Sequence, residues 1–90
     1  MSSDVPQRAV SVREMEIDGD VTLFHAETQE ALVLNATASD VWRLLDGERS
    51  VDEIVKALAP AYAADAVVVR AGVESALAQL EEHRALEWAG

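Results

Sequence analysis

The residues that could carry metal or nucleophilic chemistry are two histidines and a few serines. His25 and His83 lie far apart in the sequence, in different predicted elements, and the chain has no cysteine. A zinc site needs three or four ligands, and catalytic zinc sites commonly pair closely spaced histidines. We therefore expect no metal site. His83 falls near the end of a predicted helix, where a cationic ring suits the negative end of the helix dipole.

Ser39, Ser50 and Ser75 could act as nucleophiles only beside a positioned base. Ser50 is better explained as a helix cap, and no histidine is predicted near the other two. The sequence has neither a Gly-x-Ser-x-Gly motif nor a phosphate-binding glycine loop. Acidic pairs at residues 52–53 and 81–82 are adjacent, so they diverge around a helix into solvent. We therefore expect a protein that is not an enzyme and has no cofactor.

The composition fits one small acidic domain. The chain has 90 residues, half of them hydrophobic, and a net charge of −10 from 17 acidic and 7 basic residues. This charge opposes binding to a phosphate backbone, so it argues against nucleic acid. It suits either simple solubility or a basic peptide or enzyme surface. No signal peptide and no run of about 20 apolar residues occurs, so we expect a soluble, cytoplasmic protein without a membrane partner.

Turn signals divide the first third of the chain into a tail and three strands. Residues 1–9 are polar and without periodicity, which predicts a disordered tail before one domain over residues 10–90. Strands are predicted at residues 10–17, 21–27 and 31–34. The Asp-Gly pair at residues 18–19 is typical of the first connecting turn.

Three helices are predicted after the strands. The first begins at the cap Thr37, with Asp40 completing a capping box, and ends at Gly47. The second begins at Ser50, with Glu53 completing a Ser-x-x-Glu capping box. The element order predicts an α+β fold in which a three-stranded antiparallel sheet precedes three helices.

Proline and apolar residues set further expectations for the second half. Pro60 should stop or kink the second helix near residue 59, leaving Tyr62 beyond the break as part of the core. Asp65 is predicted to cap a third helix over residues 66–83. Leu86 and Trp88 are expected to fold back and seal the core.

The third strand is the feature that best suits binding. Glu30 precedes an apolar run at residues 31–34, and an edge strand there would carry unpaired N–H and C=O groups. An extended peptide could add to such an edge, and the alternative is a short, twisted edge without a function. The valines at residues 67–69 either all fill the core or line a groove against the strand. Gly72, inside the third helix, can mark close approach of another element.

Two consecutive motifs span the end of the third strand and the first two helices. Residues 34–47 read Leu-Asn-Ala-Thr-Ala-Ser-Asp-Val-Trp-Arg-Leu-Leu-Asp-Gly, and residues 50–54 read Ser-Val-Asp-Glu-Ile. In these motifs, and in its last helix, the chain resembles the PqqD-like family. The resemblance implies a winged helix-turn-helix domain that binds the leader segment of a ribosomally synthesised precursor peptide and does no chemistry itself.

The resemblance also implies where the leader lies: antiparallel along the third strand, in a groove closed by the third helix. Carried over position by position, the site comprises Glu30, Ala31, Leu32, Val33, Leu34, Val69, Arg70, Val73, Glu74 and Leu77. The implied partners are the leader and a processing or modifying enzyme. That enzyme is a protease in lasso-peptide pathways, which we favour, or a radical enzyme in the quinone-cofactor (PQQ) pathway.

Two positions outside the proposed groove depart from the family pattern. Gln29 stands where a glycine is frequent before the third strand, and Arg84 replaces the glycine of a His-Gly-Ala-Leu sequence. Arg84 must therefore stay helical or accept a positive φ.

Two alternatives of other classes stay open. A DNA-binding winged helix shares the topology, but its helices would offer Lys56, Arg70 and Arg84 among many acidic residues. A structural subunit could instead dock on an enzyme through the same edge strand. That strand could also pair with itself in a weak homodimer.

Overall fold

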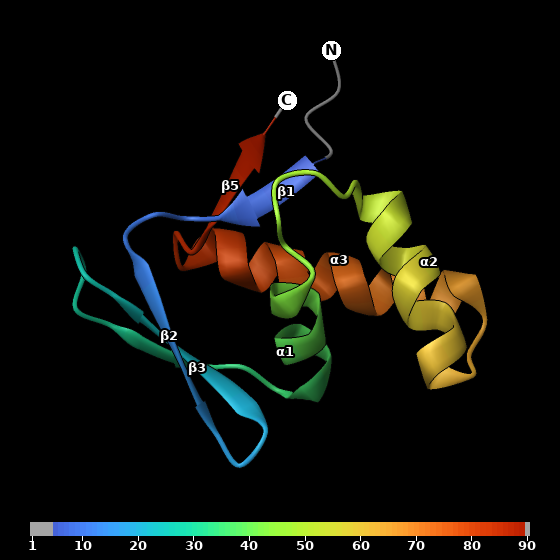
Figure 1. The fold of residues 1–90 in the computed structure, drawn as a ribbon, viewed down its shortest axis with the longest axis horizontal. Helices are drawn as coiled ribbons and strands as arrows, with labels where there is room; N and C mark the ends of the chain where they lie inside the picture. Colours follow the sequence, from blue (N-terminus) through green and yellow to red (C-terminus); the bar gives the residue numbers. More distant parts are fainter. Residues whose placement is uncertain (1–4, 90) are drawn as a thin grey trace.

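Eight short elements follow one another in the computed structural model, which describes residues 5–89 (Figure 1). They are β1 (Val5–Arg8), β2 (Val12–Ile17), β3 (Asp20–His25), β4 (Ala31–Val33), α1 (Ala36–Arg43), α2 (Val51–Tyr62), α3 (Ala66–Glu82) and β5 (Leu86–Ala89). Three helices accompany a three-stranded antiparallel sheet, which confirms the predicted α+β class. No helix among these residues is long and apolar enough to span a membrane.

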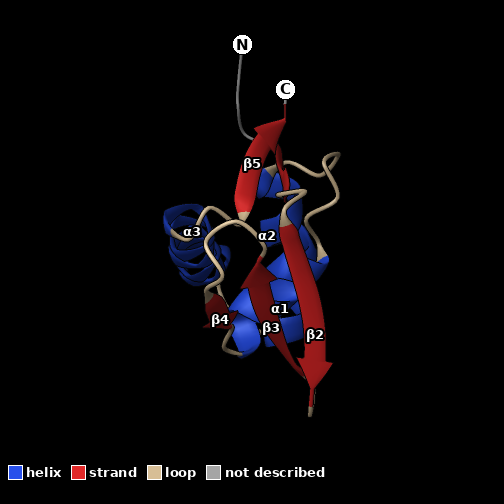
Figure 2. Cartoon of the chain, turned by 90° about the vertical axis from the view of Figure 1, so that its left-hand side faces the viewer, coloured by secondary structure: helices blue, strands red, loops and turns tan. Residues whose placement is uncertain are grey.

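The main sheet is an antiparallel meander in the order β2-β3-β4. Leu23 lies opposite Leu32, and both side chains turn toward the helices, whereas Phe24 and Val33 project from the other face and are exposed. Figure 2 looks onto that uncovered face, with α1 behind the sheet and α3 beside β4. The β2–β3 turn has positive φ at Asp18 and Gly19, as the Asp-Gly pair predicted.

A second, two-stranded sheet corrects the predicted disordered tail, residues 1–9, for the part from Val5 to Arg8. Residues 5–8 form β1, which pairs antiparallel with β5, and the two strands lie side by side in Figure 1. Pro6 is fully buried, and Arg8 donates two 3.2 Å hydrogen bonds to the Trp42 carbonyl. Sequence periodicity could not reveal this strand, because contacts with distant residues hold it. Residues 1–4 lie outside the described part of the chain.

The start and the end of α1 both differ from the prediction. Asn35 is the cap instead of Thr37: its backbone is extended, and its Oδ1 accepts a hydrogen bond from the Ala38 N–H at 2.8 Å. Thr37 already lies within the first turn. Gly47 does adopt positive φ, but the helix ends at Arg43, so this glycine shapes the following loop.

The second helix begins as predicted and ends later than predicted. Ser50 and Glu53 form a complete capping box, with bonds of 3.2 and 2.8 Å. The helix continues through Pro60 to Tyr62, because the carbonyl that Pro60 leaves without a partner belongs to exposed Lys56, where water can bond it. Tyr62 is no core residue: it is 37% exposed, and its hydroxyl donates to Asp40 at 2.5 Å.

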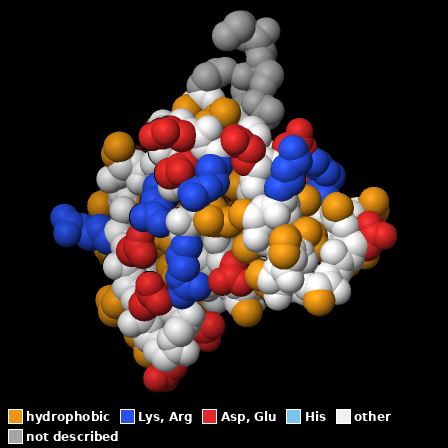
Figure 3. Space-filling view, turned by 45° about the vertical axis from the view of Figure 1, so that its right-hand side comes forward, with side chains coloured by type: hydrophobic (Ala, Val, Ile, Leu, Met, Phe, Trp, Pro, Cys, Tyr) orange, Lys and Arg blue, Asp and Glu red, His pale blue; other side chains and the backbone are white. Residues whose placement is uncertain are grey.

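The core lies where α3 crosses α1 and α2 and meets the sheet. Trp42 is buried at its centre, and its Nε1–H donates to Glu14 at 3.0 Å while the Arg8 guanidinium lies 5.0 Å from its ring centroid. Leu86 joins this core as predicted, but Trp88 is 37% exposed and seals it only in part. On the face drawn in Figure 3, acidic and basic side chains are intermingled.

Candidate functional site

The edge of β4 carries backbone groups that turn away from the sheet. The N–H of His25 donates to the Glu30 carbonyl, and the N–H of Leu34 donates to the Val21 carbonyl, both at 2.9 Å. Bonded and non-bonded pairs alternate in an antiparallel ladder, so the N–H and C=O groups of Ala31 and Val33 point outward. Among residues 5–89 no strand pairs with this edge.

The side chains around β4 divide between the two faces of the sheet. Leu34 is fully buried in the core, and Leu32 is half-buried on the side of α3. Ala31 and Val33 lie on the uncovered face, where Val33 is 67% exposed. The five predicted strand residues, 30–34, therefore form one edge with an anchored inner face and an accessible outer face.

The face of α3 toward the start of α1, just after β4, carries small and polar side chains. Gly72, Ser75 and Gln79 line a hollow of about 190 Å³, together with Asn35 and Thr37 at the start of α1. A Cβ on Gly72 would lie 3.7 Å from the Thr37 methyl group, so α1 and α3 approach closely here. Sequence reasoning did not assign Ser75 or Gln79 to the site. Their spacing from Gly72, three and seven positions along one helix, is the signal that could have found them.

Two of the helix residues predicted for the groove, Arg70 and Glu74, line a different hollow from Gly72. Arg70 and Glu74 are each two positions from Gly72, which places them roughly on the opposite side of α3, because two residues turn about 200°. They line a hollow of about 390 Å³ between α2, α3 and β5, beside Leu77 and Trp88. Val69 and Val73 are buried in the core. The structure therefore brings the β4 residues together but does not place Arg70 and Glu74 beside them.

An ion pair occupies that second hollow. Arg70 is bonded to Asp52 on α2 and lies 3.8 Å from Glu74. The hydrogen bond from Arg70, and then its charge, lower the pKa of Asp52 below its ordinary value. Both side chains are largely exposed, so this pair contributes little to stability.

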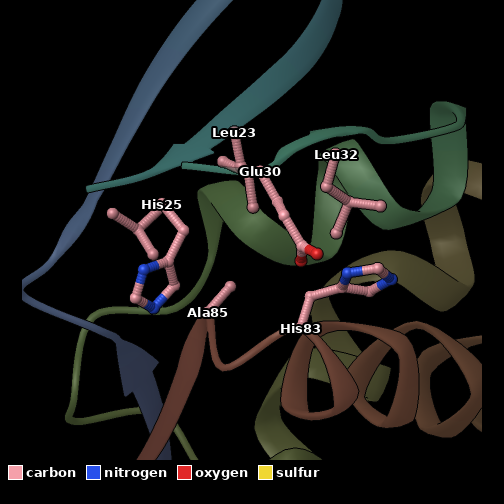
Figure 4. A pocket seen from close by; sticks show the side chains of 7 residues that line it. Leu23, His25, Glu30, Leu32, His83 and Ala85 are labelled. Atoms are coloured by element: carbon pink, nitrogen blue, oxygen red, sulfur yellow. The ribbon is translucent and has the colours of Figure 1, made fainter. Parts of the chain in front are cut away.

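A small cavity of about 10 Å³ lies between β3, β4 and the turn after α3. Its lining includes His25, Glu30, Leu32 and His83. In Figure 4 the Glu30 carboxylate reaches toward His83, and the His25 ring lies on the other side, beside Ala85. His25 and His83 thus belong to one neighbourhood although they are far apart in the sequence. In the described part of the chain, no group of three or more His, Asp or Glu residues could hold a metal ion.

The family model described as Coenzyme PQQ synthesis protein D (PqqD) matches residues 20–86. A curated relative, the PqqA binding protein of Gluconobacter oxydans (strain 621H), is 38% identical over 58 residues. That match covers 64% of this chain but 60% of the relative, less than two thirds of its length.

Three solved structures share the fold. TbiB1 in complex with the TbiA(beta) leader peptide has a TM-score of 0.82 and 30% identity, covering 90% of this chain and 94% of that one. The PqqD truncation of Methylobacterium extorquens PqqCD, described as a stand-alone RiPP recognition element, has a TM-score of 0.78 and 31% identity, covering 94% and 90%. A lasso peptide synthetase B1 complexed with the leader peptide has a TM-score of 0.78, and at 21% identity shows the fold alone.

Proposed function

This chain belongs to the PqqD family, and on that premise we propose that it is a non-catalytic recognition protein for the leader segment of a ribosomally synthesised precursor peptide. It delivers the bound precursor to a processing or modifying enzyme. The similarity to TbiB1, whose structure holds a leader peptide, supports this function over most of the chain. As the enzyme partner we favour a lasso-type leader protease, which the sequence resemblance implies. A radical enzyme of a quinone-cofactor pathway is the alternative, which the likeness to the PqqA binding protein keeps open.

The free edge of β4 is the observation that carries the proposal. Ala31 and Val33 each offer an outward N–H and an outward C=O, so an extended leader joins the sheet as a further antiparallel strand. These backbone bonds supply affinity without reading the leader's sequence. Side chains of the added strand alternate between its faces, so every second residue of the leader faces α3 and can be read there.

The hollow on α3 supplies the specificity in this proposal. Gly72 leaves room, and the hydroxyl of Ser75 and the amide of Gln79 offer hydrogen bonds to a side chain that enters from β4. We assign the reading of the leader to these residues rather than to Arg70 and Glu74, which face away from β4. The buried side chains of Val69 and Val73 pack in the core and fix the position of α3.

Fluorescence anisotropy with a labelled leader peptide tests the proposed function. The probe is the leader of the precursor encoded beside this chain, and the control is a scrambled peptide of the same composition. We expect saturable binding of the leader at micromolar protein and at least about tenfold weaker binding of the scrambled peptide, a difference of about 1.4 kcal/mol. Equal affinity for both peptides would contradict sequence-specific recognition of a leader.

A further inference from the structure

His25 is a buried histidine whose ring joins three segments of the chain. It lies at the end of β3 and is 7% exposed. Its Nδ1 is 3.2 Å from the Glu27 nitrogen and 3.4 Å from the Thr28 nitrogen, both in the β3–β4 turn. Its Nε2 is 3.2 Å from the Arg84 carbonyl oxygen, in the turn after α3.

These partners define the protonation state of the ring. Backbone N–H groups donate, so Nδ1 must accept, and a carbonyl oxygen accepts, so Nε2 must donate. The ring that satisfies all three contacts is the neutral imidazole with its proton on Nε2. A proton added to Nδ1 would point at two N–H donors and leave both without their acceptor.

The same residue fixes the start of the β4 edge. The His25 N–H donates to the Glu30 carbonyl at 2.9 Å, and the Gln29 N–H donates to the His25 carbonyl at 2.8 Å. Gln29 holds a positive φ of 60°, and Arg84 holds one of 59°, conformations that a side chain disfavours. The imidazole thus ties together two turns that have strained backbones, and β4 begins directly after the first of them.

We propose that neutral His25 positions the peptide-binding edge of β4, so that leader affinity falls when His25 is protonated. This inference rests on the proposed function, since it concerns the same edge. Protonation releases the Glu27 and Thr28 N–H groups from the ring and loosens the turn that sets the position of Glu30 and Ala31. The backbone groups of Ala31 and Val33 are then no longer held where an added strand meets them.

The charged groups around His25 come from each element that packs against it. Glu27 lies in the β3–β4 turn and Glu30 directly before β4, and His83 and Arg84 follow α3. The residue opposite His25 on β2 is uncharged Val12. Histidine is the side-chain type whose ordinary pKa, about 6.5, lies between pH 5 and 8, so a pH change in this range addresses the histidines and not the carboxylates or the arginine. The chain has two histidines, so His83 is the side chain to separate from His25.

The test measures leader affinity by anisotropy at pH 7.0 and 5.5, with a leader peptide that contains no histidine. Wild type is compared with His25→Asn and with the matched control His83→Asn. An asparagine Oδ1 can accept from the turn N–H groups as Nδ1 does, and it does not titrate. We expect about tenfold weaker binding at pH 5.5 for wild type and His83→Asn, the effect of about one lost hydrogen bond. We expect no pH dependence for His25→Asn.

A loss of affinity that persists in His25→Asn, or one that disappears in His83→Asn, would overturn the inference. If His25→Asn fails to fold, ¹⁵N NMR of the wild-type imidazole tests the inference instead. A proton on Nδ1 at pH 7.0 would contradict the inference. An unprotonated Nδ1, with Glu27 and Thr28 amide signals that shift as the ring titrates, would support it. Wild type that binds equally at both pH values refutes this inference alone. Wild type that binds no leader at pH 7.0 refutes the proposed function, and the ring measurement still tests the role of His25.

Discussion

Proline at position 33 should separate peptide binding from folding. The Val33 N–H points out of the sheet, so its loss removes no bond of the β3–β4 ladder. Leu32 is already extended, as the residue before a proline must be, and the Val33 side chain is 67% exposed. We therefore expect Val33→Pro to lower the free energy of unfolding by at most about 1 kcal/mol, chiefly through lost β propensity.

The effect on leader binding should be larger. Proline removes one N–H···O bond to the added strand, worth about 1 kcal/mol net, and leaves the facing leader carbonyl without a donor, at a cost of about 1–2 kcal/mol more. The sum of about 2–3 kcal/mol corresponds to a Kd roughly 30- to 150-fold higher.

Two controls isolate the backbone contribution, with urea unfolding and leader anisotropy as the assays. Val33→Ala keeps the N–H and should bind within about threefold of wild type, since it loses an exposed side chain. Leu32→Pro removes a donor that faces β3 and should destabilise the fold instead. A folded Val33→Pro protein with unaltered leader affinity would refute strand addition at β4.

Three further predictions concern the parts that hold the site in place. Asn35→Ala should lower the free energy of unfolding by about 1 kcal/mol through the lost cap of α1, and Thr37→Ala should lower it by clearly less. A larger loss for Thr37→Ala than for Asn35→Ala in urea unfolding would contradict the assignment of the cap. Arg8→Ala should lower the free energy of unfolding by about 1–2 kcal/mol, because Arg8 donates to the Trp42 carbonyl and lies against the Trp42 ring. The control Arg13→Ala, at an exposed position, should change the free energy of unfolding by less than about 0.5 kcal/mol. Equal losses in the two variants would refute a structural role for β1. The N–H groups of Arg49 and Glu48 donate to the Asp46 carboxylate and lower its pKa. Asp46 therefore stabilises the fold at pH values above the ordinary pKa of an Asp, about 4. This stabilisation disappears as the pH falls through the lowered pKa. The gap in urea midpoint between wild type and Asp46→Ala should therefore close below about pH 4, and a gap that persists at pH 2 would contradict this reasoning.

Local signals in the sequence predicted several local features of the fold, although they misplaced the cap of α1, which is Asn35 and not Thr37. The Asp-Gly pair at residues 18–19 requires positive φ, and the Ser50–Glu53 capping box satisfies its own N–H groups within one turn. Asp65 caps α3 by the same kind of short-range bond, which its Oδ1 accepts from the Val67 N–H at 3.0 Å. Each of these features depends on residues a few positions apart, so its pattern is visible without the rest of the fold.

Features that depend on distant residues could not be predicted in the same way. Pro6 becomes part of a strand only because β5 returns from the far end of the chain. The hydrophobic pattern of α3 identified its buried face, centred on Val73, but not which exposed face would lie beside β4. That choice depends on how α1 packs on α3 at Gly72. In our proposal Ser75 and Gln79 therefore read the leader in place of Arg70 and Glu74.

An amide-resolved NMR titration of the protein with its leader peptide tests the central claim most directly. Strand addition at β4 should produce shifts at Ala31, Leu32 and Val33, and at Gly72, Ser75 and Gln79 on the facing side of α3, with slowed hydrogen exchange of the outward Ala31 and Val33 amides. Shifts confined to the other side of α3, around Arg70, Glu74 and Trp88, would contradict recognition at the β4 edge, as would an absence of shifts in the folded protein.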